Sequence, residues 1–366
     1  MISRLVEWWH RTRWGWLVIL GPVIVYLSLL VSLDLVGLAA DGDPYFREVD
    51  PRTAFRSGIE RDLASMSGRM EFALASVLYF LVAIFSIIWA LPRILGRYRN
   101  PFGGLLGVLI AGAMVGFLYF LYLISDYNIR IAFADDVLRL GEDAGAVDLV
   151  TVRFWPFGMA LYEEVMPQSQ MLASIHAIVY LIGGAAPWVL VVFMANIASF
   201  EPRSLGKESH KALRMRMVNL QIALALAALN IVLSVYYLHT MMGWPLRLFE
   251  DELAASFLAA ATRYSALFGV LGTLMLLSTL APAYLALNRQ YDLVAEHELM
   301  KAGDDYVSYE ERIAWRRKHG LLLSAQQAVT AGVAVVAPLI TSPALPTADT
   351  DGPPPSRFEQ QLRQAR

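Results

Sequence analysis

The chain has 366 residues, of which 57% are apolar and 17% are charged. Soluble domains contain about 45–50% apolar and about 25% charged residues, so this composition indicates an integral membrane protein. The net charge of −2 gives no basic excess for binding nucleic acid. The absence of cysteine excludes disulfides, thiolate metal sites and cysteine nucleophiles in this chain.

Six stretches of the sequence are long, apolar and nearly free of charged residues. Each is long enough to cross about 30 Å of hydrocarbon as a helix rising about 1.5 Å per residue. The first follows Arg4, Arg11 and Arg13 but is longer than a signal-peptide core, so we expect a retained anchor. The predicted fold class is therefore all-α, a polytopic membrane protein with a six-helix transmembrane bundle. The predicted spans are 14–38, 72–91, 102–125, 173–200, 218–241 and 264–287.

The charges between the spans predict the orientation, because Lys and Arg are retained on the cytoplasmic side of short loops. One set of connections holds 11 basic against three acidic residues, and the other set holds nine basic against 17 acidic residues. Both termini are therefore expected in the cytoplasm, and the localisation that fits is a bacterial inner (plasma) membrane. The basic set is 1–13, 93–101 and 201–217, and the acidic set is 41–70, 126–172 and 242–261.

This orientation divides the chain into a transmembrane domain and cytoplasmic ends. The predicted parts are a cytoplasmic N-terminus, 1–13, a transmembrane domain, 14–287, a cytoplasmic helical tail, 288–340, and a disordered C-terminus, 341–366. The predicted outer loops are 39–71, 126–172 and 242–263.

Each outer loop carries apolar residues at helical spacing, which predicts amphipathic helices lying at the membrane surface. The first helix is expected to begin at Pro51 and the third at Pro245, because proline is favoured at the first helical position. The second is expected over 129–140, followed by an aromatic segment around Pro156 at headgroup depth.

Two capping boxes in the tail, Ser308 to Glu311 and Ser324 to Gln327, predict two further helices. The second of these, 325–340, is mostly apolar and fits a docked helix, a re-entrant helix or a seventh span. Docking is favoured, because the apolar stretch is short and a span would export a tail that contains three arginines.

No Asp, Glu, Lys or Arg lies in the central part of any predicted span, which argues against a carboxylate-based proton pump. Asp34, Glu71 and Arg263 sit near the outer span ends, where they are candidates for pairing with one another.

Uncharged polar residues form a stripe on the fifth span and a smaller set on the fourth. They fit either a solute path or hydrogen bonds between helices, and the second interpretation is favoured because such contacts are common in bundles. These residues are Asn219, Asn230, Ser234 and Tyr237 on the fifth span and His176, Tyr180 and Asn196 on the fourth.

Small residues on the third and sixth spans predict faces where helix backbones approach closely. Packing within the chain is favoured over packing against another copy or a partner. The glycines are Gly103, Gly107, Gly112 and Gly116 on the third span and Gly269 and Gly272 on the sixth.

No catalytic, metal-binding or cofactor-binding residues are predicted. Adjacent carboxylates such as Glu163-Glu164 point about 100° apart on a helix, and the HExxH, GxSxG and GxxxxGK(S/T) motifs are absent. The leading functional hypothesis is a non-catalytic subunit, anchor or sensor that contacts the lipid bilayer or a protein partner at the tail or the outer helices. The alternative is a transporter or channel for a small uncharged or lipid-like solute, and the third is an intramembrane enzyme without a recognisable motif.

Overall fold

The computed structural model describes the parts of the chain that form the bundle. Several predicted features lie wholly or mostly outside the described residues: the span 102–125, the helices 129–140 and 325–340, and both chain ends. The described residues are 14–25, 28, 58–96, 109–110, 112–113, 116, 138, 150–154, 162–166, 168–199, 210–249, 251–301 and 307–319.

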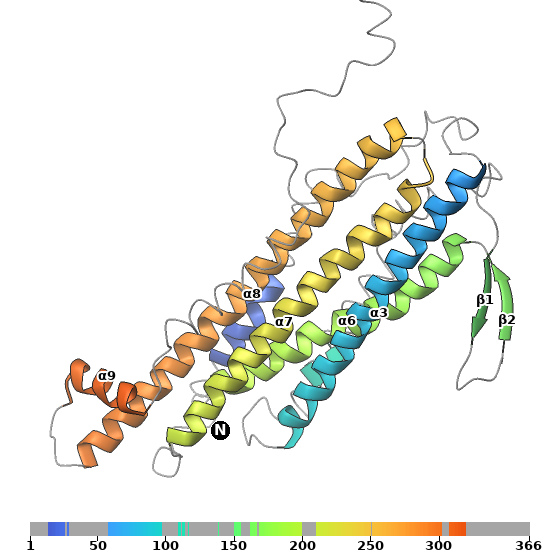
Figure 1. Ribbon diagram of the computed structural model, residues 1–366. Helices are drawn as coiled ribbons and strands as arrows, with labels where there is room; N and C mark the ends of the chain where they lie inside the picture. The colour runs from blue at the N-terminus through green and yellow to red at the C-terminus, as the bar shows by residue number, and fades with distance from the viewer. Residues whose placement is uncertain are drawn as a thin grey trace, which may run out of the picture.

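Four long helices run side by side and carry a short fifth helix at one end (Figure 1). The long helices alternate in direction where they are consecutive, so α6 runs down the bundle, α7 returns and α8 runs down again (Figure 1). The helices are α3 (Gly58–Gly96), α6 (Gln168–Ala198), α7 (His210–Leu246), α8 (Asp251–Lys301) and α9 (Tyr309–Lys318), and the strands are β1 (Val150–Phe154) and β2 (Tyr162–Met166).

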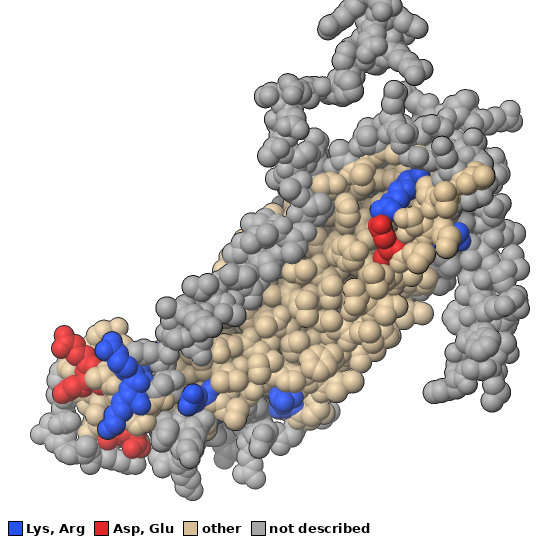
Figure 2. Space-filling view, viewed as in Figure 1, with Lys and Arg blue, Asp and Glu red and all other residues tan. Residues whose placement is uncertain are grey.

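Four of these helices are long and apolar enough to cross a membrane, which is consistent with a helical membrane protein. Figure 2 shows a broad belt without charged residues between charged groups at the two ends of this face. The segments that meet the criteria are Leu63–Leu95, Leu181–Ala198, Ala212–Leu246 and Ser265–Met300, and Trp14–Val25 is a shorter apolar helix.

Helix α6 lies at the centre of the described bundle. Its apolar segment is 72% buried, whereas the corresponding segments of α3, α7 and α8 are 33–39% buried. No charged residue occurs in α6, as expected for a helix that contacts protein on most sides. Gly183 lets α6 approach α3, because a Cβ there would lie 2.5 Å from the ring of Tyr79.

The helix Trp14–Val25 packs against α8. Val18 and Ile19 are fully buried in the larger apolar core, and a Cβ on Gly21 would lie 2.7 Å from the carbonyl oxygen of Ser278. The first predicted span therefore contributes to the bundle over its described part.

The third outer helix does not begin at Pro245 as expected. Pro245 lies in the last turn of α7, and the next helix begins at Asp251. The position is helical because proline's fixed φ is compatible with an α-helix and because the flanking Trp244 and Leu246 are buried, which holds this last turn against the core. The helix that follows is continuous with the last predicted span.

The first surface helix is likewise not separate from its span. Helix α3 runs without a break from Gly58 to Gly96, so its described residues form one long helix. The helix start expected at Pro51 lies outside the described residues.

A two-stranded ribbon replaces part of the predicted aromatic segment of the second outer loop. β1 and β2 pair antiparallel with Thr151 opposite Val165 and Arg153 opposite Glu163, and β2 leads almost directly into α6 (Figure 1). Three β-branched residues in succession, Val150 to Val152, favour a strand over a helix here.

The beginning of the predicted tail continues α8 to Lys301, and α9 follows. The capping box of α9 is confirmed: the Ser308 hydroxyl accepts from Glu311 N–H, and the Glu311 carboxylate accepts from Ser308 N–H.

Candidate functional site: a pocket at one end of the bundle

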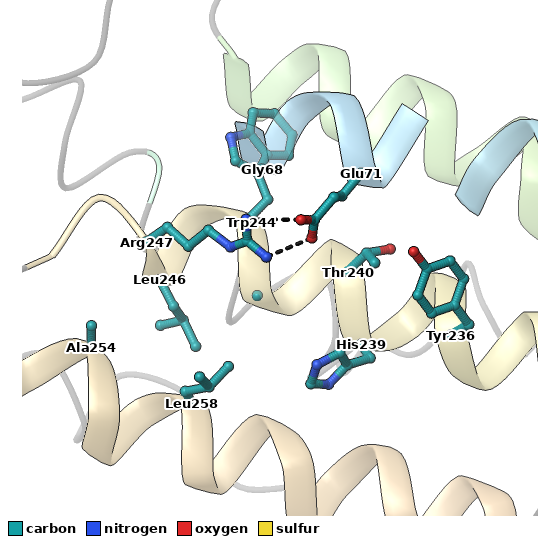
Figure 3. A pocket seen from close by; sticks show the side chains of 11 residues that line it. Gly68, Glu71, Tyr236, His239, Thr240, Trp244, Leu246, Arg247, Ala254 and Leu258 are labelled. Atoms are coloured by element: carbon teal, nitrogen blue, oxygen red, sulfur yellow. Dashed lines mark hydrogen bonds and ion pairs between the residues drawn. The ribbon is translucent and has the colours of Figure 1, made fainter. Parts of the chain in front are cut away.

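A pocket of about 530 Å³ lies where α3 begins, α7 ends and α8 begins, which we call the pocket end of the bundle. The opposite end, where α8 finishes and α9 packs, is called the α9 end. The pocket is lined by Gly68 and Glu71 from α3, by Tyr236, His239, Thr240, Gly243, Trp244, Leu246 and Arg247 from α7 and the turn after it, and by Ala254 and Leu258 from α8 (Figure 3).

An ion pair closes one side of this pocket. The guanidinium of Arg247 donates to both carboxylate oxygens of Glu71, at 3.2 and 2.5 Å, and to the Ser67 hydroxyl at 3.1 Å. Both charged side chains remain partly accessible, with exposed fractions of 41% for Arg247 and 45% for Glu71. Because of this exposure, the pair contributes at most about 1 kcal/mol to stability.

The turn that follows α7 holds Arg247 in place. The backbone N–H of Arg247 donates to the carbonyls of Gly243 and Trp244, and the backbone N–H of Leu248 donates to the carbonyl of Pro245. These bonds tighten the end of the helix, as 3₁₀-type bonds commonly do. The guanidinium therefore extends from a fixed backbone towards α3.

Aromatic packing fixes the wall of the pocket beside the ion pair. The Trp244 ring stacks on Phe72 with 5.6 Å between centroids, and Trp244 is 1% exposed. Gly68 makes this possible, because a Cβ there would lie 2.7 Å from Cδ1 of Trp244. The ends of α3 and α7 are thus joined by both an aromatic contact and an ion pair.

The remaining lining combines apolar and polar groups. Figure 3 shows Leu246 from α7 and Leu258 from α8 facing one another beyond the Arg247–Glu71 pair. His239 projects from α7 towards α8, and its buried Nδ1 has no hydrogen-bond partner among the described residues (Figure 3). The pocket therefore combines a partly exposed ion pair, an imidazole ring with a buried nitrogen and an apolar cleft.

Two members of the predicted polar stripe of the fifth span, Asn230 and Tyr237, contact α3 and α6. Asn230 is fully buried, and its Nδ2 donates to Ser86 Oγ on α3 at 2.7 Å and to the Leu226 carbonyl at 2.8 Å. Tyr237 and His176 form a second contact, with 2.9 Å between the hydroxyl oxygen and Nδ1. The structure therefore brings Tyr237 and His176 together and joins Asn230 to Ser86, which the sequence analysis did not single out.

The other members of the predicted set lie apart from these contacts. Ser234 donates to the Ile231 carbonyl within α7, Asn219 is partly buried, and Asn196 is fully buried in α6. Tyr180 lies in α6, but its side chain is outside the described residues.

The predicted glycine faces have different surroundings. A Cβ on Gly272 would lie 2.2 Å from Cγ2 of Ile231, so α8 approaches α7 closely there, while Gly269 accepts from Thr273 through its carbonyl. A Cβ on Gly112 or Gly116 would meet no atom within 4 Å. Gly103 and Gly107 lie outside the described residues.

The sequence analysis identified Glu71 as a candidate for pairing but not Arg247. The signal was present, because Arg247 is the only basic residue in the acidic connection 242–261. Asp34 lies outside the described residues, as does the side chain of Arg263.

The described residues contain no group of three or more His, Asp or Glu side chains that could hold a metal ion. The pocket is therefore considered for its charges and its apolar cleft. No protein-family model, no curated protein and no solved structure matches this chain.

Proposed function

We propose that this chain is a six-span, non-catalytic protein of a bacterial inner membrane, with both termini in the cytoplasm. It works as a subunit, anchor or sensor through contacts with another protein or with lipid. The observation that carries this proposal is the use of Asn230 and Tyr237 of α7 as contacts between helices.

These contacts weigh against a solute path along α7. Nδ2 of Asn230 donates to the hydroxyl oxygen of Ser86, and this hydroxyl in turn donates to the Val82 carbonyl. From α7 and its turn, the pocket is lined only by residues between Tyr236 and Arg247, so its described lining stops before Ser234 and Asn230. A path for a small solute would need these polar groups to face a continuous cavity.

Helix α9 provides a surface suited to a partner. Arg316 is 7% exposed, donates to Asp292 at 3.2 Å and to Asn288 at 2.6 Å, and lies over the Tyr291 ring. This network fixes α9 on α8, while Glu310, Arg317 and Lys318 of α9 are exposed. A rigid charged helix outside the hydrocarbon is a suitable docking surface for a cytoplasmic protein.

The distribution of charge supports the proposed orientation. Arg93 lies in the last turn of α3, and Arg214 and Arg216 lie near the start of α7, at the same end as α9. Basic residues concentrated at one end favour the cytoplasm for that end.

Purification from native membranes into nanodiscs, with mass spectrometry of the copurifying proteins, tests the proposal. We expect a protein partner in stoichiometric amount, and its recovery should fall when Arg317 and Lys318 are changed to alanine. Arg214→Ala is the matched control, because it removes an exposed basic side chain from α7 near the same end. A chain that purifies repeatedly without a stoichiometric protein partner contradicts the subunit proposal.

A further inference from the structure

We propose that the pocket between α3, α7 and α8 binds one phospholipid with a zwitterionic phosphoethanolamine headgroup. The lipid would come from the leaflet at the pocket end. This inference rests on the proposed function for the membrane location of the bundle, but it requires no protein partner.

The ion pair is complementary to the two charges of this headgroup. The bonds of Arg247 to Ser67 and Glu71 use both N–H groups of Nη1 and one N–H group of Nη2. The other N–H group of Nη2 and the Nε–H group can donate to a phosphate oxygen. Each carboxylate oxygen of Glu71 has a second lone pair, which can accept from an ammonium group. A ligand with a single charge would be attracted by one member of the pair and repelled by the other.

The mixture of charged and apolar side chains in the lining also favours a lipid over a soluble zwitterion. Charged groups and apolar side chains line the same pocket, with Leu246, Ala254 and Leu258 beside the Arg247–Glu71 pair (Figure 3). Snorkelling charges above an apolar cleft are typical of the region where headgroups meet acyl chains. The volume of about 530 Å³ lies within the range of about 300–1,000 Å³ for ligand pockets.

An exposed apolar stripe continues from the pocket along α7. Tyr236 lines the pocket and is 40% exposed, and Leu229 and Ile222 follow at intervals of seven residues towards the other end, also exposed. Residues seven apart lie on nearly the same face of a helix. An acyl chain can follow this stripe while the headgroup occupies the pocket.

His239 adds a second polar side chain to the lining of the pocket. Its buried Nδ1 has no hydrogen-bond partner in the described part of the chain, although it lines the pocket. A buried ring nitrogen without a partner is costly, and a lipid ester or glycerol oxygen, or a water held by one, can satisfy it. We therefore expect the imidazole to contact the lipid backbone between the headgroup and the acyl chains.

Native mass spectrometry of the purified full chain, titrated with phosphatidylethanolamine or phosphatidylglycerol, tests this site. We expect one phosphatidylethanolamine to bind more tightly than phosphatidylglycerol, which has a phosphate but no ammonium group. Glu71→Gln should weaken phosphatidylethanolamine by about tenfold, as expected for loss of one charge-assisted hydrogen bond, and should not weaken phosphatidylglycerol.

Glu310→Gln, which removes an exposed carboxylate from α9, is the matched control and should leave both affinities unchanged. Leu258→Trp, which fills the apolar cleft without touching the ion pair, should weaken both lipids and provides a second variant if Glu71→Gln does not fold. Glycerophosphoethanolamine, which has the headgroup without acyl chains, should not displace the lipid at equal concentration.

Equal binding of the two lipids, or an unchanged ratio in Glu71→Gln, overturns the lipid proposal. Displacement by glycerophosphoethanolamine would also overturn it, because a soluble zwitterion would then be sufficient. Since the measurement uses the chain alone, its failure is distinguishable from the absence of a protein partner in the copurification experiment.

Discussion

At the scale of the residue, close approach between helices depends on single small or polar side chains. Gly183 and Gly184 are adjacent in α6, but only the first faces Tyr79 of α3. Sequence composition predicts that glycines permit close packing, whereas the choice between two adjacent glycines depends on the rotation of α6 relative to its neighbour.

This difference predicts opposite effects of two matched substitutions. Gly183→Ala should lower the free energy of unfolding by about 1–3 kcal/mol, because the new methyl group would overlap the Tyr79 ring. Gly184→Ala should leave it unchanged or raise it by up to about 1 kcal/mol, because alanine favours the helix and its Cβ meets no atom within 4 Å. Thermal denaturation in one detergent measures both, and an equal loss of stability in the two variants would contradict the packing described here.

At the scale of the element, helix type was predictable, whereas helix ends were predictable only where a local cap determines them. Continuous apolar runs predicted the membrane helices, and the Ser308–Glu311 spacing predicted the start of α9. The role of Pro245 was wrong, because tertiary packing of its neighbours determines whether a proline begins or ends a helix. The ribbon of β1 and β2 was missed, because the aromatic residues around Pro156 were read as a surface segment and the β-branched run before them was not considered.

The cap of α9 makes this helix sensitive to acid. The Ser308 backbone N–H and hydroxyl hold the pKa of Glu311 below its usual value, so the carboxylate is the form that stabilises the folded helix. This stabilisation is present above the ordinary pKa of glutamate and is lost as the pH falls through the lowered value. Hydrogen exchange in 309–318, corrected for intrinsic rates, should therefore lose protection on acidification, and Glu311→Gln should remove most of that pH dependence. An unchanged pH dependence in this variant would show that another group is responsible.

The contact between α9 and α8 depends on one buried arginine. Arg316→Ala should increase hydrogen exchange throughout 309–318, because it removes the bonds to Asp292 and Asn288 and leaves those groups without a charged partner. Arg317→Ala, next to it in sequence but exposed, is the control and should leave exchange unchanged. Equal exchange in both variants would mean that the Arg316 network does not hold α9.

At the scale of the whole molecule, four described helices make a bundle with an apolar belt and charged ends. Composition was sufficient to predict the membrane class, because burial in lipid requires long uncharged helices. The pocket was not predictable, since it combines Glu71, Arg247 and Leu258 from three elements whose relative rotation is determined by packing.

The proposed orientation can be tested without background labelling, because the chain contains no cysteine. In spheroplasts, a membrane-impermeant maleimide should label Ile59→Cys at the exposed start of α3 and should not label Lys318→Cys until the membrane is permeabilised. The reverse pattern would place α9 outside the cytoplasm and overturn the orientation.

The most direct test of the central claim, that polar side chains within the spans join helices rather than line a solute path, is a double-mutant cycle. The free energy of unfolding is measured in bicelles for the parent, Asn230→Leu, Ser86→Ala and the double variant. The account predicts a loss of about 1 kcal/mol for Asn230→Leu and a coupling energy of about 0.6 kcal/mol between the two positions, as for hydrogen bonds between membrane helices. Full stability in both single variants with no coupling would contradict it.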